Sequence, residues 1–185
     1  MFAEWLTSRL ADIVELSPQQ IADLETHFNF LLKWNRAMNL TSVRDPEEIV
    51  ERHYCESLFL GSHLPPGRLK IADIGSGAGF PGFPVAVLRP DSSVTLIESR
   101  QRKSVFLKES TRHVTNVRVI SKPAEAVNES FDWAISRAVK PADITDAISR
   151  IATHVAILTT ERSDLKLPWG TKHYLSMFHV ERSDR

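Results

Sequence analysis

The chain has 185 residues, 42% of them hydrophobic and 25% charged, which suits one soluble globular unit with its own hydrophobic core. Its formal net charge is zero, which argues against a protein that binds free RNA through a general excess of Lys and Arg. The single cysteine, Cys55, excludes an intrachain disulfide, and no apolar run approaches membrane-spanning length. The N-terminus also lacks a cationic stretch followed by an apolar core, so we expect a cytoplasmic protein.

The charges are unevenly distributed along the chain. Residues 1–66 carry five basic and ten acidic side chains, whereas residues 67–185 carry eighteen and thirteen. The segment from Ser99 to Lys122 contains one acidic residue, Glu109, and seven basic residues: Arg100, Arg102, Lys103, Lys108, Arg112, Arg118 and Lys122. Most such runs are solvated helix faces, but this one is also the best candidate for a phosphate-facing surface. Arg102 and Lys103 are therefore our candidate RNA contacts.

The first third of the sequence has helical patterning. Ser17 is an N-cap candidate, with Pro18 at the first helical position and Gln20 three residues after the cap. A second start signal lies at Asp45-Pro-Glu-Glu, where acidic residues occupy the first turn as the helix dipole favours. We expect that second helix to run to about Gly61. Cys55 falls within it and is expected to be a small buried hydrophobic side chain.

The segment Leu64-Pro-Pro-Gly67 breaks the helical pattern. We expect residues 1–66 to be a helical extension packed on a core of residues 67–185, the two forming one structural unit. Short apolar runs, typical of buried parallel strands, lie at Leu69–Ile74, Val94–Ile97, Val117–Ile120, Phe131–Ser136 and His154–Thr159, with Lys172–Val180 as a final edge strand. Helical stretches lie between them at Pro84–Leu88, Arg100–His113 and Asp143–Ala152. The alternation predicts an α/β, Rossmann-like fold, a mainly parallel sheet with helices on both faces.

A glycine-rich loop, Asp73-Ile-Gly-Ser-Gly-Ala-Gly-Phe-Pro-Gly82, joins the first strand to a helix. Its spacing differs from the dinucleotide fingerprint G-x-G-x-x-G, and no Gly-Lys-Ser/Thr of a P-loop follows. Gly75, Gly77 and Gly79 would let the backbone approach a ligand closely, and Asp73 could face a cationic amino group. S-adenosylmethionine offers an amine, a carboxylate and a ribose without phosphate. The loop is therefore predicted to hold S-adenosylmethionine.

Glu98 ends the second strand about 20 residues after the loop, where a carboxylate can accept hydrogen bonds from ribose hydroxyls. A Gly-rich turn followed by a surface glutamate is the plain alternative. The joint pattern of strand, glycine loop, helix, strand and acid favours cofactor binding over that alternative.

The residues Asp73–Gly82 resemble the loop of the glucose-inhibited-division protein B family, the small-subunit ribosomal RNA guanine-N7 methyltransferase G. The Gly-Phe-Pro-Gly extension is more specific than the general methyltransferase loop. Other matches are Trp34-Asn-Arg-Ala-Met-Asn-Leu-Thr-Ser42, Arg52-His53 followed by Ser57, and Ser136-Arg-Ala138. The resemblance covers roughly Ala22 to Lys140. It implies methyl transfer from S-adenosylmethionine to N7 of a guanine in small-subunit (16S) ribosomal RNA. Because the whole chain is neutral, we expect the small ribosomal subunit to be a better substrate than naked RNA, and we expect the chain to act as a monomer.

The resemblance also implies roles for individual residues. Gly75 and Phe80 match loop positions that contact the cofactor, and Ala124-Glu125 match a pair that borders the adenine. Arg137 matches an arginine that lines the cofactor and target site, and a cation at the carboxyl end of a strand points into the ligand crevice. Phe80 could equally be a core residue and Glu125 an ordinary helix-start acid. We expect Arg137 to orient the reactants, without a general base.

Asn35 and Asn39 lie four residues apart and are expected to share a helix face. Asparagine is mildly unfavourable inside a helix, which indicates either an RNA contact or a polar capping contact. His53 is expected to be a structural histidine. The scattered histidines predict no metal site.

The sequence departs from the family after the fifth strand, where Val155-Ala-Ile-Leu-Thr-Thr-Glu-Arg162 replaces an alanine-leucine-lysine-glycine type stretch, and the C-terminal part is short. Two other functions stay open. One is a methyltransferase that acts on a protein or a small molecule. The other is a non-catalytic cofactor-binding module that associates with RNA or a partner. A nicotinamide dehydrogenase fits poorly because of the glycine spacing.

Overall fold

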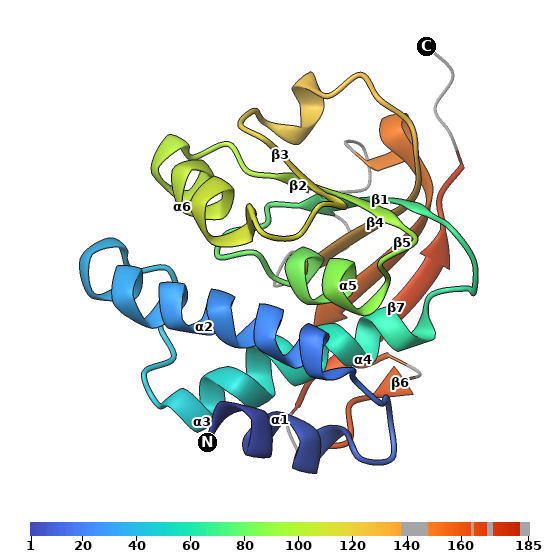
Figure 1. The fold of residues 1–185 in the computed structure, drawn as a ribbon. Coiled ribbons are helices and arrows are strands. Elements are labelled where there is room, and N and C mark those ends of the chain that lie inside the picture. The colour runs from blue at the N-terminus through green and yellow to red at the C-terminus, as the bar shows by residue number, and fades with distance from the viewer. Residues whose placement is uncertain (138–147, 164, 170–171, 182–185) are drawn as a thin grey trace.

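The computed structural model describes residues 1–137, 148–163, 165–169 and 172–181. Its centre is a seven-stranded sheet in the order β3-β2-β1-β4-β5-β7-β6 (Figure 1). The strands are β1 (Lys70–Ile74), β2 (Ser93–Ile97), β3 (Val117–Ile120), β4 (Phe131–Arg137), β5 (Ala152–Thr159), β6 (Leu165–Lys166) and β7 (Tyr174–His179). β1 to β5 pair in parallel, whereas β7 runs antiparallel to both β5 and β6.

The helices are α1 (Phe2–Leu10), α2 (Pro18–Met38), α3 (Pro46–Ile49), the π-helix η1 (Val50–Cys55), α4 (Glu56–His63), α5 (Gly82–Leu88), α6 (Gln101–Thr111) and the 3₁₀-helix η2 (Ala124–Ala126). The N-terminal helices lie below the sheet in Figure 1, around α5. No helix in the described part of the chain combines the length and apolarity that crossing a membrane requires.

The capping box predicted at the start of α2 is confirmed. The Ser17 hydroxyl accepts from the Gln20 N–H, and the Gln20 side chain accepts from the Ser17 N–H. The second predicted helix also begins where expected, since the Asp45 side chain accepts from the Glu48 N–H. That helix differs from the prediction in its middle. There the backbone takes a π-helical form over residues 50–55 before α4 continues to His63.

Two predictions at the C-terminal end need correction. The segment 172–180 does contain a strand, β7, but β7 is not the edge, because the chain folds back and β6 pairs with its outer side. Of the helix predicted over residues 143–152, residues 143–147 lie outside the described residues. Residues 148–151 are helical, and Ala152 instead begins β5.

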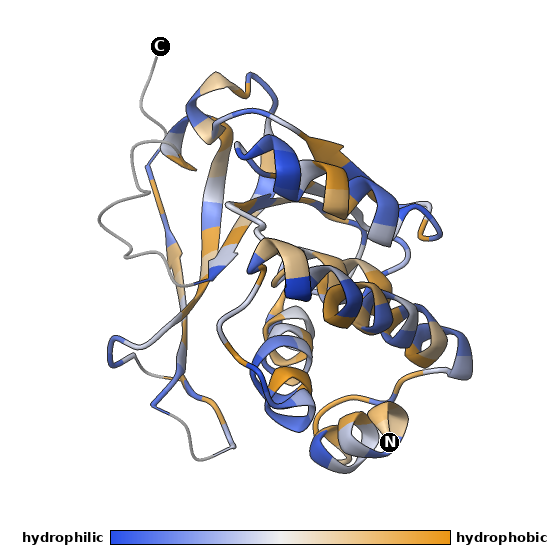
Figure 2. Cartoon of the chain, turned by 90° about the vertical axis from the view of Figure 1, so that its left-hand side faces the viewer, coloured by the Kyte–Doolittle hydropathy of each residue, from blue (hydrophilic) through white to orange (hydrophobic). Residues whose placement is uncertain are grey.

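The hydrophobic core forms one cluster on each face of the sheet. Figure 2 shows hydrophobic stretches, in orange, on the strands and on the helices beside them. Because side chains alternate along a strand, Ile71 of β1 packs with the N-terminal helices, α5 and α6, while Ala72 packs on the other face with Ile148 and Ile151. The helical extension shares the larger cluster with the sheet. Its α2 also donates a hydrogen bond from the Gln20 amide to the Val87 carbonyl at the end of α5.

Candidate functional site

The glycine loop lies where β1 ends, at the edge formed by the carboxyl ends of the parallel strands. The N–H groups of Gly75 and Ser76 both donate to the Ile97 carbonyl at the end of β2, at 2.9 and 3.1 Å. Gly75 and Gly77 have φ values of +69° and +58°, which side-chain-bearing residues rarely adopt. A Cβ on Gly75 would meet no atom of the described residues within 4 Å. The loop therefore presents bare backbone to open space.

Asp73 does not face that space. Its side chain is fully buried, and one carboxylate oxygen accepts from the Gly82 N–H at 2.9 Å, at the start of α5. A Cβ on Gly82 would lie 2.5 Å from that oxygen, so the close approach requires glycine there. Burial raises the pKa of Asp73 to about 7. This oxygen joins the loop to α5, while the other Asp73 oxygen is buried without a hydrogen-bond partner among the described residues. The direct contact between Asp73 and a ligand amine stays a prediction.

Glu98 follows β2 and is almost fully buried. Its two carboxylate oxygens accept from the N–H groups of Gly77, at 3.0 Å, and Arg100, at 2.8 Å. A carboxylate has about four lone-pair positions, so each oxygen retains room for a further donor. Glu98 therefore lies against the glycine loop, as the predicted ribose contact requires.

The candidate adenine contacts follow the next strand. Ala124 and Glu125 form the short η2 helix beyond the carboxyl end of β3, and Ala124 is half-buried while Glu125 is exposed. Between them and β3 lies Ser121, whose buried hydroxyl has no hydrogen-bond partner among the described residues. The loop, Glu98 and η2 thus follow three neighbouring strands along one edge of the sheet.

Phe80 lies beneath the loop rather than in it. Its ring stacks on His53 with a centroid distance of 4.9 Å and meets Tyr54 edge-on at 5.0 Å. The ring is 6% exposed. This position agrees with the alternative in which Phe80 is a core residue. The Phe80 ring links the loop to the π-helix η1. Burial lowers the pKa of His53 to about 3, so its imidazole is neutral near pH 7.

Arg137, at the end of β4, is paired with an acid that the local sequence does not reveal. One Glu56 oxygen lies 3.0 Å from the Arg137 guanidinium. The other lies 2.6 Å from Nδ1 of His173, within hydrogen-bond distance. The Glu56 side chain is only 1% exposed. Arg137 also donates to the backbone carbonyl of Arg52 in η1. Burial lowers the pKa of Arg137, and the charge of Glu56 counters this.

A cavity of about 420 Å³ opens beside this cluster at the carboxyl ends of β4 and β5. Its lining comes from the helical extension and from the C-terminal half of the chain: Ser42, Val43, Arg52, His53, Glu56, Arg137, Leu158, Thr159, Thr160, Glu161 and His173. From this set, the sequence analysis named Arg137 as a candidate functional residue and His53 as a structural histidine, and it missed Glu56, His173 and Glu161 as candidates. A π-helical turn often marks a functional site, and η1 carries Arg52 and His53 into the lining.

The two candidate asparagines have structural partners. Asn35 is 6% exposed, and its side-chain oxygen accepts from the Thr41 N–H at 2.9 Å. Asn39 is not inside the helix as expected. It caps the end of α2 in the left-handed conformation, with a φ of +48°, and its side-chain oxygen accepts from Arg44 at 3.4 Å. Of the two alternatives, the capping contact is what the structure describes.

The candidate RNA contacts on α6 lie on the surface. Arg102 is exposed and Lys103 is half-buried, in the first turn of α6. Among the described residues, no cluster of His, Cys, Asp and Glu could hold a metal ion. Cys55 is buried, as predicted.

A family model for rRNA small subunit methyltransferase G matches residues 20–156. The chain belongs to this family. A methyltransferase G of Halorhodospira halophila is 43% identical over 143 residues, covering 75% of this chain and 67% of that protein. One of Xylella fastidiosa is 38% identical over 148 residues, covering 78% and 68%, and one of Xanthomonas campestris is 43% identical over 122 residues, covering 64% and 57%. The resemblance drawn from the loop is therefore confirmed.

Solved structures confirm the methyltransferase fold. A SAM-dependent methyltransferase from Aquifex aeolicus superposes with a TM-score of 0.52 at 18% identity, covering 70% of this chain and 77% of that one. Coclaurine N-methyltransferase bound to N-methylheliamine and SAH gives 0.50 at 17% identity, covering 85% and 57%. The methyltransferase G match contains the glycine loop, Glu98, Glu56 and Arg137, but it ends before Glu161 and His173.

Proposed function

We propose that this chain transfers a methyl group from S-adenosylmethionine to N7 of a guanine in small-subunit ribosomal RNA. The observation that carries the proposal is the arrangement along one sheet edge. The open loop after β1 and Glu98 after β2 lie on one side of β4, and the cavity with Arg137 lies at β4 and β5. In open α/β sheets, ligands bind outside the carboxyl ends of the strands.

The residues after β1, β2 and β3 fit the cofactor. Gly75 and Gly77 leave the loop backbone free to approach the methionine part, and Glu98 would accept from the ribose hydroxyls. Ala124 and Glu125 would border the adenine, and close by in sequence lies the Ser121 hydroxyl, which has no partner in the described part of the chain. When bound, S-adenosylmethionine supplies a methyl group on a positively charged sulfur.

The acceptor chemistry explains which side chains the site needs. Guanine N7 has an in-plane lone pair and no proton, so the protein must align the base rather than deprotonate it, and alignment alone accelerates a reaction strongly. His53 has a pKa lowered to about 3 by burial, and Arg137 carries no acceptor atom. Arg137, held by Glu56 and the Arg52 carbonyl, would orient the base.

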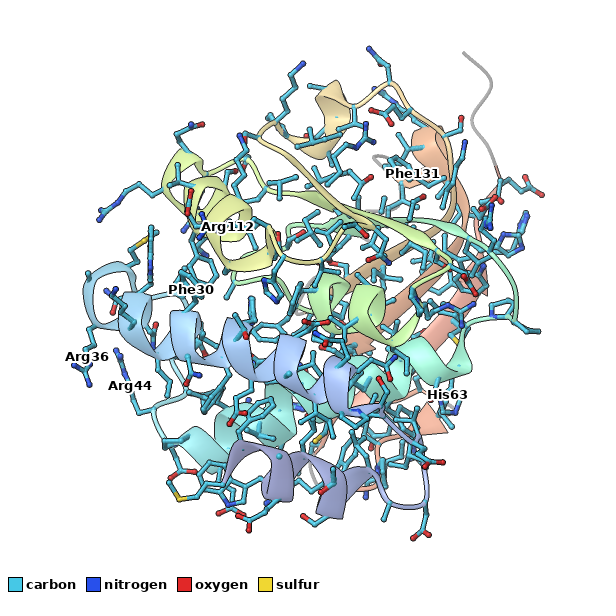
Figure 3. All side chains as sticks on the ribbon, viewed as in Figure 1. Phe30, Arg36, Arg44, His63, Arg112 and Phe131 are labelled. Atoms are coloured by element: carbon cyan, nitrogen blue, oxygen red, sulfur yellow. The ribbon has the colours of Figure 1, made fainter. Side chains whose placement is uncertain are left out.

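The RNA would approach over basic side chains at the adjoining ends of α2 and α6. Trp34 lies against Phe106 at 5.7 Å, and His113 at the end of α6 contacts the Asp23 carbonyl. The two helices are therefore antiparallel, and the C-terminal end of α2 lies beside the first turn of α6. This places exposed Arg36 and Arg44 on the same side as Arg102 and Lys103. Figure 3 shows Arg36 and Arg44 pointing away from the body of the molecule.

The remaining parts of the proposal concern where and how the chain works. Because the net charge is zero, affinity for naked RNA would be weak, and a small ribosomal subunit that presents a shaped site would be the better substrate. We propose that the chain acts there as a monomer in the cytoplasm. The shared hydrophobic cluster supports one structural unit of extension (1–66) and core (67–185).

The test is methyl transfer from labelled S-adenosylmethionine to small ribosomal subunits, followed by nucleoside mass spectrometry. We expect 7-methylguanosine. A Glu98→Ala variant should bind the cofactor about 10- to 100-fold more weakly, as the loss of about 1.5–3 kcal/mol in charge-assisted hydrogen bonds implies, with little change in thermal stability. Cofactor binding without transfer to any ribosomal substrate would instead favour a non-catalytic module.

A further inference from the structure

The cavity contains a carboxylate that has no partner among the residues that the structure describes. Glu161 follows β5 in the cavity wall, and the residue is exposed. Its backbone N–H donates to the Thr159 hydroxyl at 3.0 Å, which fixes the turn. Within the described residues, the Glu161 carboxylate takes part in no hydrogen bond or ion pair, whereas Glu56 in the same cavity holds both Arg137 and His173.

We propose that Glu161 recognises the acceptor guanine by accepting hydrogen bonds from its N1–H and N2 amino group. This inference rests on the proposed methyl transfer to guanine N7. Guanine is the common purine that presents two adjacent donors on that edge, and they match the two oxygens of a carboxylate. The residue lies beyond the segment that matches the family model, in the stretch where the sequence departs from the family pattern.

The order of the strands orients the base. The candidate cofactor residues follow β1, β2 and β3, Arg137 ends β4, and Glu161 follows β5 on the far side of Arg137. N7 must face the cofactor to receive the methyl group. The N1–H and N2 amino groups lie on the opposite side of the purine from N7. A base in this cavity with N7 toward the loop therefore directs those donors toward the end of β5.

The charge change during transfer favours a carboxylate at this place. The N7 lone pair forms a bond to the methyl carbon while the carbon–sulfur bond breaks and leaves its electron pair on sulfur. No proton is released, and the positive charge passes to the guanine ring. The ring N–H groups then become stronger donors, so their bonds to Glu161 strengthen as the reaction proceeds. Interactions that strengthen in the transition state raise kcat.

The charges already present agree with this assignment. Arg137 places a cation near a base that gains positive charge, but Glu56 at 3.0 Å offsets it. Among the described residues, Glu161 forms no ion pair, whereas the other cation in the lining, Arg52, pairs with Glu48. The same carboxylate would reject adenine, which presents a lone pair at N1 and lacks the N2 amino group, since a mismatched polar group left unpaired lowers affinity.

The experiment compares nucleotide binding by wild type, Glu161→Gln and a control, Glu181→Gln. Glu181 is exposed after β7, and because β7 runs antiparallel to β5, it lies at the opposite edge of the sheet. Binding of GMP, IMP and AMP is measured by saturation-transfer NMR in the presence of S-adenosylhomocysteine. The wild type and the control should prefer GMP, with IMP weaker because it lacks the N2 amino group, and AMP weakest.

Glu161→Gln should lower the preference for GMP over AMP by about 10- to 100-fold, the discrimination expected of a bidentate base contact, because its amide offers one acceptor and one donor. With small subunits as substrate it should lower kcat more than it changes KM. An unchanged GMP-to-AMP ratio in Glu161→Gln, or no purine preference in the wild type, would overturn the proposal. A GMP preference without methyl transfer to ribosomal RNA would contradict the proposed function and leave the Glu161 assignment standing.

Discussion

Replacing Glu56 by Gln should destabilise the protein far more than replacing a surface acid. The carboxylate is 1% exposed and lies 3.0 Å from Arg137 and 2.6 Å from His173. Removing one charge of a buried ion pair leaves the other charge buried without a partner, which costs about 3–5 kcal/mol. Because Gln keeps the shape and one acceptor oxygen, we expect the lower end, about 3 kcal/mol. That is a large part of the total stability of a typical domain, about 5–15 kcal/mol.

The assay is urea unfolding at neutral pH, followed by circular dichroism, with Glu48→Gln as the matched control. Glu48 pairs with Arg52 at 2.9 Å one helical turn away, and the two side chains are 47% and 35% exposed, so that pair is worth only about 0.3–0.5 kcal/mol. If the two variants unfold within about 0.5 kcal/mol of each other, the Glu56 cluster is not a buried pair in solution. Methyl transfer by the folded fraction of Glu56→Gln should also fall, because Arg137 loses its anchor.

Three further outcomes are expected. Gly77→Val should abolish S-adenosylmethionine binding, measured by calorimetry, because a β-branched residue does not adopt a φ of +58° without strain. The control is Gly67→Val, because Gly67 also has a positive φ, +97°, with no described atom near its Cβ position, but lies outside the site. This variant should be less stable and should keep its cofactor affinity. If both variants lost the same affinity, the loop assignment would be contradicted. Replacing Arg102 and Lys103 together by Ala should flatten the salt dependence of substrate binding by a slope of up to about 2; an unchanged slope means that this face is merely solvated. Asp73 has a pKa raised by burial from 3.8 to about 7, so its contribution to the unfolding free energy is fully present below about pH 4 and is lost as the pH rises through about 7. Asp73→Asn should remove that contribution. Between about pH 4 and 7, the slope of the unfolding free energy against pH should then be more positive in the variant than in the wild type, by up to about 1.4 kcal/mol per pH unit. The same slope in both proteins would refute a protonated Asp73.

The features that the sequence predicted well are those with local causes. The apolar runs that became β1 to β5 and the glycine spacing between β1 and α5 are each contained within a few residues. The N-cap signals at Ser17 and Asp45 likewise act within one helical turn. The position of Glu98 at the end of β2 follows from the length of one strand–helix–strand unit.

Two placements had signals in the sequence. Asp73 lies two residues after Ile71, so alternation puts both on the face of the sheet that packs against α5, where one Asp73 oxygen accepts from Gly82. Asn39 precedes Leu40-Thr41, and asparagine is a common left-handed residue at a helix end, which favours a cap over a shared helix face.

The Glu56 cluster could not be predicted in this way. Its members are separated by 81 residues between Glu56 and Arg137 and by 117 between Glu56 and His173, and they meet only because β4 and β7 flank β5. Arg137 therefore looked unpaired in the sequence and is paired in the fold. The π-helical form of η1, which supplies the Arg52 carbonyl to Arg137, also has no recognisable local pattern.

The contact between α2 and Gly79 of the glycine loop couples ligand binding to a helix that is distant in the sequence. Nε2 of His27 lies 3.1 Å from where a Cβ on Gly79 would be, and Nδ1 of the same ring shares a hydrogen bond with the Tyr54 hydroxyl at 2.7 Å. Opening α2 would therefore remove the support of the loop. A ligand that binds only the supported loop stabilises it by mass action, so the amide protons of α2 should exchange with solvent more slowly when the cofactor is bound.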